Sequence, residues 1–331
     1  MAEEAPRCGA KLEFVSFPDR PFPIALLDAP TMLRRVRMLG ADVLVVDSIA
    51  AAFLGPWLTV SPPVLPVVGM LHQPPGGIDH GPVRTAVQSA LDRLAYRRTR
   101  LLMVASESLA EQLSAEGVPG KTLKVVPPGR DLAAVPVAAS MDLRLGRGAA
   151  FLCVGNWIER KGIHCLLDAF ALLPEGAATL HLVGDDMAGS RYARRLRERL
   201  ALPDLAGRVV VHGPLSREAV AAMYLAADVF VLPSFKEPYG TVYGEAMAAG
   251  LPVVGWRAGN LPHLAEHERE GLLVSPNDLE GLSRALARLS ADAALRSRLG
   301  TAARERARAR PTWSESAALF YGAIREGAES R

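Results

Sequence analysis

The 331-residue sequence predicts an α/β protein with two doubly wound parallel sheets. Short runs of apolar and β-branched residues alternate with stretches rich in Ala, Leu and Arg, first over residues 11–127 and again over residues 150–325. Runs such as "VLVV" (43–46) are apolar at every position, which is typical of strands buried on both faces of a parallel sheet. Two such series in one chain predict two Rossmann-like domains that face a cleft.

The first series predicts five strands and three helices. The strands are expected at residues 11–17, 42–47, 64–71, 101–106 and 123–127. The helices are expected near residues 30–39, 83–98 and 107–116. Ser106 directly precedes the last of these helices, so we expect its hydroxyl to cap the helix, with Glu107 in the first turn.

Residues 127–148 contain Pro, Gly and small residues without a sustained period, which predicts a linker. The second series follows the linker. Its strands are expected at residues 150–155, 179–184, 208–213, 228–234, 251–256 and 270–275. Its helices are expected near residues 163–173, 190–200, 216–226, 241–249, 279–289, 292–309 and 313–325.

Composition and charge exclude several classes of protein. The formal net charge of +3 is too small to indicate nucleic-acid binding, although it permits contact with a phosphorylated substrate or an anionic membrane. The three cysteines, Cys8, Cys153 and Cys165, lack metal-ligand spacing and predict reduced thiols in a cytoplasmic protein. No apolar run approaches the ~20 residues that span a bilayer, and the polar N-terminus does not resemble a signal peptide.

The segment "SFKEPYGTVYGEAMAAGLPVV" (234–254) combines a glycine turn, a helix start and two acids. The helix is expected to begin at Gly240, Thr241 and Val242, where unpaired N–H groups favour an anion. Gly240 has no side chain to keep a phosphate away from the backbone. The sequence therefore predicts an anion site at this turn.

Glu245 lies one turn into the same helix among apolar residues. A buried carboxylate without a partner costs several kcal/mol, whereas the helix dipole contributes only ~0.3–1 kcal/mol. Two vicinal hydroxyls, as on a ribose, would satisfy both of its oxygens. Glu237, just upstream, could accept from a sugar on the other side of the phosphates. The alternative is that Glu237 is a solvated loop acid and Glu245 a carboxylate favoured by the helix dipole.

The spacing Glu-x7-Glu in this segment resembles the signature region of the family 4 retaining glycosyltransferases, which have the GT-B fold. Residues 151–173, "FLCVGNWIERKGIHCLLDAFALL", resemble the first strand, phosphate-binding loop and helix of that family. The segments "AADVFVLPS" and "GLLVSPND" also resemble segments of that family. Residues 104–132 resemble the end of the family's N-terminal domain, and residues 312–327 resemble the helix that crosses back onto it.

The resemblance implies a domain organisation and a substrate class. Residues 1–145 would form the acceptor-side domain, residues 146–310 the donor-binding domain, and residues 311–331 a helix that packs back toward the first. The co-substrate would be a UDP- or GDP-linked sugar, and the unknown acceptor a glycan, lipid or small molecule. The reaction would be a hexosyl-type transfer that uses no separate cofactor and no metal.

The same resemblance implies roles for residues of the donor site. Glu245 would hold the ribose and Glu237 the donor sugar, while the amides at Gly240, Thr241 and Val242 would receive the diphosphate. These roles agree with the electrostatic interpretation of the segment.

Further roles concern the first loop of the donor domain and one histidine of the other domain. Lys161 matches the family lysine that neutralises the phosphates, in a loop that begins at Gly155. The family arginine after that glycine is replaced by Asn156, and Arg160 is the candidate to supply its charge, the alternative being a solvated loop arginine. His72 follows a strand and would face the donor sugar, the alternative being a histidine satisfied within the loop or core.

The N-terminal domain departs from the family pattern. No G-x-G or GG pattern precedes His72, so we expect either that the start of the sequence is placed too late or that this domain is shortened. Two other functions therefore stay open: a nucleotide-sugar-binding protein without catalysis, and a GT-B-fold sugar-nucleotide epimerase. The lack of an early G-x-G-x-x-G disfavours a dehydrogenase.

Two charged runs are ambiguous. "GDD" (184–186) is expected to be a turn rather than a metal site. "DRLAYRRTR" (92–100) is expected to be a solvated helix face, and the alternative is a patch that holds the protein at an anionic membrane or binds a phosphorylated acceptor.

Overall fold

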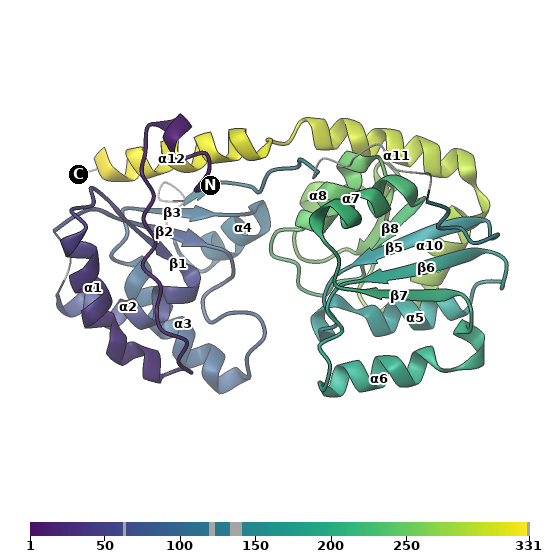
Figure 1. The fold of residues 1–331 in the computed structure, drawn as a ribbon, viewed down its shortest axis with the longest axis horizontal. Coiled ribbons are helices and arrows are strands. Elements are labelled where there is room, and N and C mark those ends of the chain that lie inside the picture. The colour runs from purple at the N-terminus through teal and green to yellow at the C-terminus, as the bar shows by residue number, and fades with distance from the viewer. Residues whose placement is uncertain (62–63, 119–122, 133–140, 330–331) are drawn as a thin grey trace. The chain divides into compact units, whose positions relative to one another are not determined.

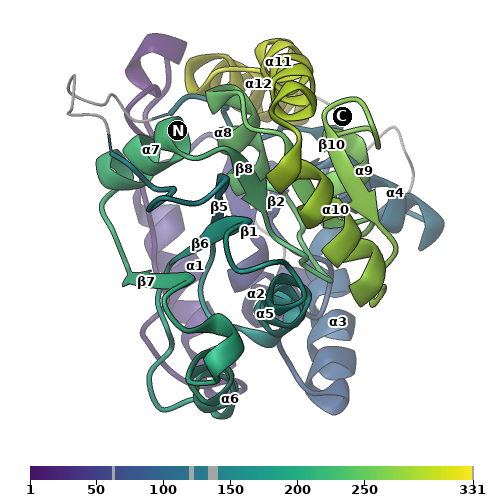
Figure 2. The same ribbon diagram turned by 90° about the vertical axis from the view of Figure 1, so that its right-hand side faces the viewer.

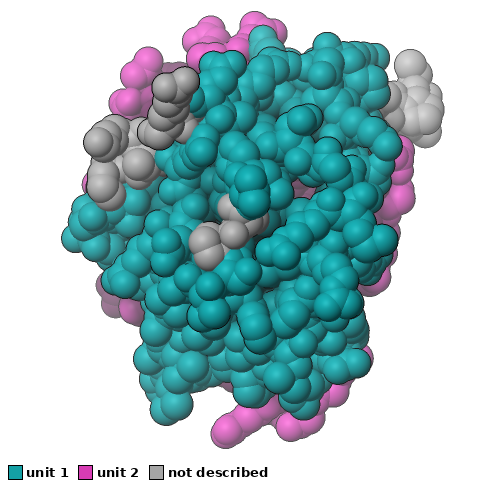
Figure 3. Space-filling view, turned by 90° about the vertical axis from the view of Figure 1, so that its left-hand side faces the viewer, with its two compact units in different colours: residues 1–129, 311–331 teal, residues 130–310 magenta. Residues whose placement is uncertain are grey.

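The computed structural model describes residues 1–61, 64–118, 123–132 and 141–329. The chain forms two compact units, unit 1 with residues 1–129 and 311–331 and unit 2 with residues 130–310, coloured separately in Figure 3. Each unit holds one parallel sheet, which confirms the prediction of two Rossmann-like α/β domains. The predicted linker at 127–148 includes residues 133–140, which lie outside the described residues.

Unit 1 is built on a four-stranded sheet in the order β1-β2-β3-β4 (Figure 1). Its strands are β1 (Leu44–Asp47), β2 (Val67–Leu71), β3 (Leu101–Val104) and β4 (Leu123–Val125). Its helices are α1 (Ala29–Met38), α2 (Ser48–Val60), α3 (Pro82–Tyr96), α4 (Glu107–Ala115) and α12 (Trp313–Glu329). One apolar core joins the sheet to α1–α4, and a second joins it to α12 and the N-terminal segment.

The C-terminal helix α12 packs on strands β2 and β3 of unit 1. Phe320 and Tyr321 share a core with Met103, which is fully buried. Gly327 makes this approach possible, because a Cβ there would lie 2.6 Å from a methyl group of Val68.

In unit 1 one prediction is wrong and one helix was not predicted. Residues 11–17 do not form a strand. Phe17 packs on Phe53 of α2 with ring centroids 5.3 Å apart, but Phe14 is 73% exposed and no residue of the segment is buried, so it lacks the burial that a central strand requires. Helix α2 was not predicted, because its sequence is apolar on all sides and contains Gly55 and Pro56. Gly55 allows close packing on α3, since a Cβ there would lie 2.2 Å from the carbonyl oxygen of Leu91.

Unit 2 contains a six-stranded parallel sheet in the order β10-β9-β8-β5-β6-β7. Its strands are β5 (Ala149–Val154), β6 (Ala178–Val183), β7 (Val209–Gly213), β8 (Val229–Val231), β9 (Val253–Trp256) and β10 (Gly271–Val274). Its helices are α5 (Ile163–Ala171), α6 (Arg191–Leu200), α7 (Arg217–Ala226), α8 (Thr241–Ala249), α9 (Leu261–Leu264), α10 (Leu279–Ala291) and α11 (Ala293–Arg308). Every strand predicted in this unit is present, and among the α-helices of its described residues the short α9 is the one that was not predicted.

The helices of unit 2 form two layers around the sheet. Helices α5, α6 and α10 pack together on one face, and α7, α8 and α11 pack together on the other (Figure 2). The strand order reverses between β5 and its neighbour β8. Ligands of doubly wound sheets bind at the carboxyl ends of the strands at such a reversal, so the loops after β5 and β8 are where a site is expected.

Candidate functional site

The loop after β5 contains four of the predicted donor-site residues. Gly155 and Asn156 follow the strand, and Arg160 and Lys161 lie in a short 3-10 helix, Glu159–Lys161. Gly162 then begins α5 with φ +67°, in the left-handed region that favours glycine.

One backbone hydrogen bond and two from side chains fix this loop to the loop after β8. The Phe235 N–H donates to the Arg160 carbonyl oxygen at 2.7 Å, and Nη1 of Arg160 donates to the Lys236 carbonyl oxygen at 2.9 Å. The Ser234 hydroxyl also donates to the Arg160 carbonyl oxygen at 3.1 Å. Arg160 therefore uses its charge to hold the second loop, while its predicted role toward phosphate stays a prediction.

Lys161 and Glu237 form a buried ion pair, with 2.5 Å between Nζ and Oε2. The side chains are buried, since Lys161 is 9% exposed and Glu237 is 7% exposed. The structure thus brings the predicted phosphate ligand and the predicted sugar ligand into direct contact. The main chain of Glu237 is also held, because its carbonyl oxygen accepts from the Asn260 N–H at 2.9 Å.

The N-terminus of α8 lies just beyond Glu237. Gly240 precedes the helix with φ +77°, and no side chain caps the helix among the described residues. Asn260, which is fully buried, donates from Nδ2 to the Tyr239 carbonyl oxygen at 2.8 Å and so holds the turn in place. The first amides of α8, at Thr241 and Val242, therefore belong to an uncapped helix start that favours an anion.

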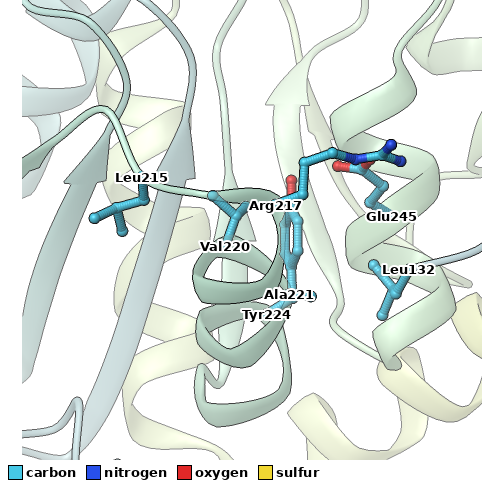
Figure 4. Close-up of a pocket in the computed structure, with 7 residues that line it drawn as sticks. All are labelled: Leu132, Leu215, Arg217, Val220, Ala221, Tyr224 and Glu245. Atoms are coloured by element: carbon cyan, nitrogen blue, oxygen red, sulfur yellow. The ribbon is translucent and has the colours of Figure 1, made fainter. Parts of the chain in front are cut away.

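Glu245 lies in a pocket of about 110 Å³ in unit 2 (Figure 4). Burial raises the pKa of the Glu245 carboxyl above its ordinary value, while Tyr224 and Arg217 oppose that shift. The remaining walls of the pocket are mostly apolar. Leu132, Leu215, Val220 and Ala221 line them. Glu245 is therefore neither a surface acid nor a core residue, but a half-buried carboxylate in a small recess.

The GDD segment forms the expected turn after β6. Oδ1 of Asp185 accepts from the Met187 N–H at 2.7 Å, and Asp186 pairs with Arg197. The Asp185 N–H donates to Oδ1 of Asn156 at 3.1 Å, so Asn156 connects this turn to the first loop. Within the described part of the chain, no group of three or more His, Cys, Asp and Glu residues has the arrangement of a metal site.

In unit 1, His72 follows β2 and contacts the end of β1. Nε2 of the His72 ring lies 2.9 Å from Oδ2 of Asp47, and the backbone N–H of His72 donates to the Ser48 hydroxyl at 3.1 Å. Asp47 also caps α2 by accepting from the Ile49 N–H at 2.8 Å. Burial acts to raise the pKa of Asp47, but the hydrogen bonds from His72 and Ile49 outweigh it and lower the pKa below its ordinary value.

The other expectations for unit 1 concern Ser106 and the arginine-rich segment. Ser106 caps α4 as predicted, since its hydroxyl accepts from the Leu109 N–H at 3.2 Å. Arg93 pairs with Glu116 at 2.6 Å, and Arg100 donates to the Ala328 carbonyl oxygen at 3.0 Å. Membrane contact through this segment stays a prediction. No helix of the described chain combines the length and apolar character needed to cross a bilayer.

Family models and relatives match most of the chain. The model described as glycosyl transferases group 1 matches residues 144–306, and the model described as glycosyltransferase family 4 matches residues 2–134. A glycogen synthase of Mycobacterium tuberculosis is 30% identical over 290 residues, which cover 82% of this chain and 68% of the relative. The chain belongs to the family 4 glycosyltransferases.

Other relatives in the family are longer than this chain. The D-inositol 3-phosphate glycosyltransferase of Pseudarthrobacter chlorophenolicus is 34% identical over 236 residues, which cover 69% of this chain and 56% of the relative. The corresponding enzyme of Xylanimonas cellulosilytica is 33% identical, over 63% of this chain and 52% of the relative. The chain thus spans little more than half the length of these two relatives.

Solved structures confirm the GT-B fold. The sucrose-phosphate synthase of Thermosynechococcus elongatus matches 96% of this chain and 82% of its own, with a TM-score of 0.76 and 25% identity. HepE of Anabaena, solved with UDP, matches 89% of this chain and 82% of its own, with a TM-score of 0.74 and 20% identity.

Three polar residues that lie beside predicted site residues were not predicted from the sequence: Asp47 beside His72, and Tyr224 and Arg217 in the pocket of Glu245. Asp47 ends a strand that the sequence predicts, and a polar residue at a strand's carboxyl end was a signal for it. Tyr224 and Arg217 gave no comparable signal, because either residue is ordinary on a helix that packs against a sheet.

Replacing Asp47 by Asn is expected to lower, by about 10- to 100-fold, any glycosyltransferase activity of the chain that depends on His72. The amide oxygen can still cap α2, but the amide nitrogen cannot accept from Nε2 of His72, so the tautomer and orientation of the ring are lost. Steady-state kinetics would show the loss in kcat, and the melting temperature should change little. Equal losses from Asp47→Asn and from the surface variant Asp19→Asn would refute a role for this contact.

Proposed function

We propose that the chain transfers a sugar, with retention of configuration, from a UDP- or GDP-linked donor to a hydroxyl of an acceptor. The observation that carries this proposal is the buried Lys161–Glu237 pair beside the uncapped start of α8. Family membership supports the reaction class. The Anabaena HepE structures with UDP and with UDP-glucose, and a GDP-mannose-dependent mannosyltransferase of Mycobacterium tuberculosis that is 30% identical, support the donor class.

Departure of the nucleoside diphosphate builds negative charge on its terminal phosphate. The Lys161 ammonium and the amides at Gly240, Thr241 and Val242 are fixed groups that would stabilise this charge. The ammonium carries three donors, so it can keep its bond to Glu237 while donating to a phosphate oxygen. Glu237 would then accept from hydroxyls of the sugar and hold its anomeric carbon in position.

Glu245 is proposed to bind the ribose of the donor. Two vicinal hydroxyls donating to its two oxygens would replace the water that a half-buried carboxylate loses. His72 is oriented by Asp47. It is proposed to be a catalytic residue that faces the donor sugar, the position that the family resemblance implies.

The test is the release of nucleoside diphosphate by the purified full chain. UDP-glucose, UDP-N-acetylglucosamine and GDP-mannose should be offered singly, with inositol 3-phosphate, a mannoside or fructose 6-phosphate as acceptor. Acceptor-dependent release, absent from a Lys161→Met preparation made in parallel, is the expected result. Calorimetric binding without turnover would favour a nucleotide-sugar-binding protein, and no binding of UDP, GDP or their sugars would refute the proposal.

A further inference from the structure

Two side chains of α7 lie with Glu245 in its pocket, and neither has a function in the donor site as proposed so far. Arg217 begins α7, and Tyr224 lies two turns further along the same helix. Glu245 comes from α8, which packs against α7. In Figure 4 the Arg217 side chain extends toward the Glu245 carboxylate, and the Tyr224 hydroxyl points to the same end of the pocket.

The Tyr224 hydroxyl is an unsatisfied buried group. Tyr224 is 1% exposed, and within the described residues its hydroxyl has no acceptor at full hydrogen-bond geometry, although the Glu245 carboxylate lies close enough to act on it. Burial and the Glu245 carboxylate raise the pKa of Tyr224 well above its ordinary value, so the hydroxyl keeps its proton and remains a donor. A buried donor without an acceptor is unfavourable, and Glu245 is the neighbouring acceptor.

Two groups beside Glu245 favour its charged form, although burial outweighs them and keeps the pKa of the carboxyl above its ordinary value. The titratable or charged groups that act on it are Tyr224 and Arg217, both of α7, while Cys153 of β5 acts only on Tyr224. Tyr224 and Arg217 both lower the pKa of the Glu245 carboxyl, whereas burial raises it. This matters for recognition, because a carboxylate accepts at both oxygens, whereas a protonated carboxyl gives up part of that capacity.

We propose that Tyr224 and Arg217 are positioning residues that hold the Glu245 carboxylate for two vicinal ribose hydroxyls, and so make the site selective for ribonucleotides over 2′-deoxyribonucleotides. The proposal rests on the proposed donor site and adds the residues that set its sugar selectivity. When a nucleotide binds, Glu245 accepts the Tyr224 hydroxyl as well as the two ribose hydroxyls. A 2′-deoxyribonucleotide lacks one of these hydroxyls and leaves one oxygen of a partly buried carboxylate without its donor. The site should therefore bind 2′-deoxyribonucleotides more weakly than ribonucleotides.

The test compares ribose selectivity among matched variants. Calorimetry would give the Kd of UDP, GDP and their 2′-deoxy counterparts for the wild type, Tyr224→Phe, Arg217→Met and the control Tyr96→Phe. Tyr96 is a suitable control because it lies in unit 1 and its buried hydroxyl also has no partner among the described residues. We expect a preference for the ribonucleotide of at least about tenfold in the wild type and control, and less than about threefold in the two α7 variants.

The outcomes separate this inference from the proposed function. Wild-type protein that binds neither UDP nor GDP overturns both. Wild-type binding with unchanged selectivity in Tyr224→Phe and Arg217→Met overturns only the inference, because a structural role for Tyr224 would weaken both nucleotides equally. Should Tyr224→Phe fail to fold, Arg217→Met decides alone, since Arg217 is exposed and its replacement leaves the core intact.

Discussion

Replacing Glu237 by Gln should lower the rate of nucleoside diphosphate release at least a hundredfold. The Lys161 ammonium lies 2.5 Å from Glu237 and would lose the carboxylate that fixes it near the leaving phosphate. The amide also accepts less strongly from the sugar hydroxyls. Steady-state release of nucleoside diphosphate with a saturating acceptor measures the effect, and it should appear mainly in kcat.

The same substitution should destabilise unit 2 by about 3 kcal/mol, because the Lys161 charge stays buried without its partner. Lys161→Met should cost a similar amount, and the double variant Lys161→Met/Glu237→Gln should regain most of the stability while staying inactive. Urea unfolding followed by fluorescence is suitable, since Trp157 and Trp256 are buried in this unit.

The control for the loss of a carboxylate is Glu280→Gln. Glu280 pairs with Arg284 at 3.4 Å with 85% of its side chain exposed, so both stability and activity should change little. A Glu237→Gln protein that is as active as Glu280→Gln would exclude Glu237 from the reaction. A double variant less stable than either single variant would show that the pair is not what stabilises these loops.

The sequence predicts unit 2 better than unit 1, and the physical reason is burial on both faces of the sheet. Strands such as β5 and β6 are buried at nearly every position, so their continuous apolar runs are unmistakable. Helix α2 also has a continuous apolar sequence, but in this case the apolar run forms a helix that packs against α3 and the sheet. Residues 11–17 contain β-branched and aromatic residues, yet they pair with no strand. The apolar sequence of α2 therefore predicts burial correctly but not backbone conformation, whereas residues 11–17, none of which is buried, show neither the predicted burial nor the predicted strand.

The sequence supplies candidates for the site residues, but it does not predict the contacts among them. Lys161 and Glu237 are separated by 76 positions, and they meet because β5 and β8 are neighbours in the sheet. Strand order depends on long-range pairing that no local pattern encodes. The same limit applies to Tyr224 and Glu245, which meet only because α7 packs on α8.

Arg160 shows a different limit. The sequence leaves open whether its charge serves a phosphate or solvent, and in the structure its guanidinium donates to the Lys236 carbonyl oxygen. That contact depends on the conformation of a loop that contains no regular element, so residue type alone could not predict it.

Replacing Gly162 by Ala should destabilise unit 2 by about 2–4 kcal/mol, from two separable causes. Gly162 has φ +67°, which costs an L-residue about 1–2 kcal/mol. A Cβ would also lie 2.1 Å from the carbonyl oxygen of Pro233, a backbone atom that cannot rotate away. Thermal and urea unfolding measure the total effect.

Gly207→Ala isolates the contribution of backbone strain. Gly207 has the same φ of +67°, but the nearest atom to its Cβ would be 4.0 Å away, on the Arg147 side chain. The Gly207→Ala substitution should therefore lower the free energy of unfolding by only ~1–2 kcal/mol, which is the cost of the backbone strain. The difference between the two variants measures how tightly the start of α5 approaches the end of β8.

That approach also positions Lys161, which directly precedes Gly162. Relief of the clash must move the loop after β5 away from Pro233, and with it Lys161 away from Glu237, so Gly162→Ala should weaken nucleoside diphosphate binding while Gly207→Ala should not. Equal stability and equal Kd in the two variants would mean that the loops adjust freely. The ion pair would then owe its geometry to its own charges rather than to the backbone that carries it.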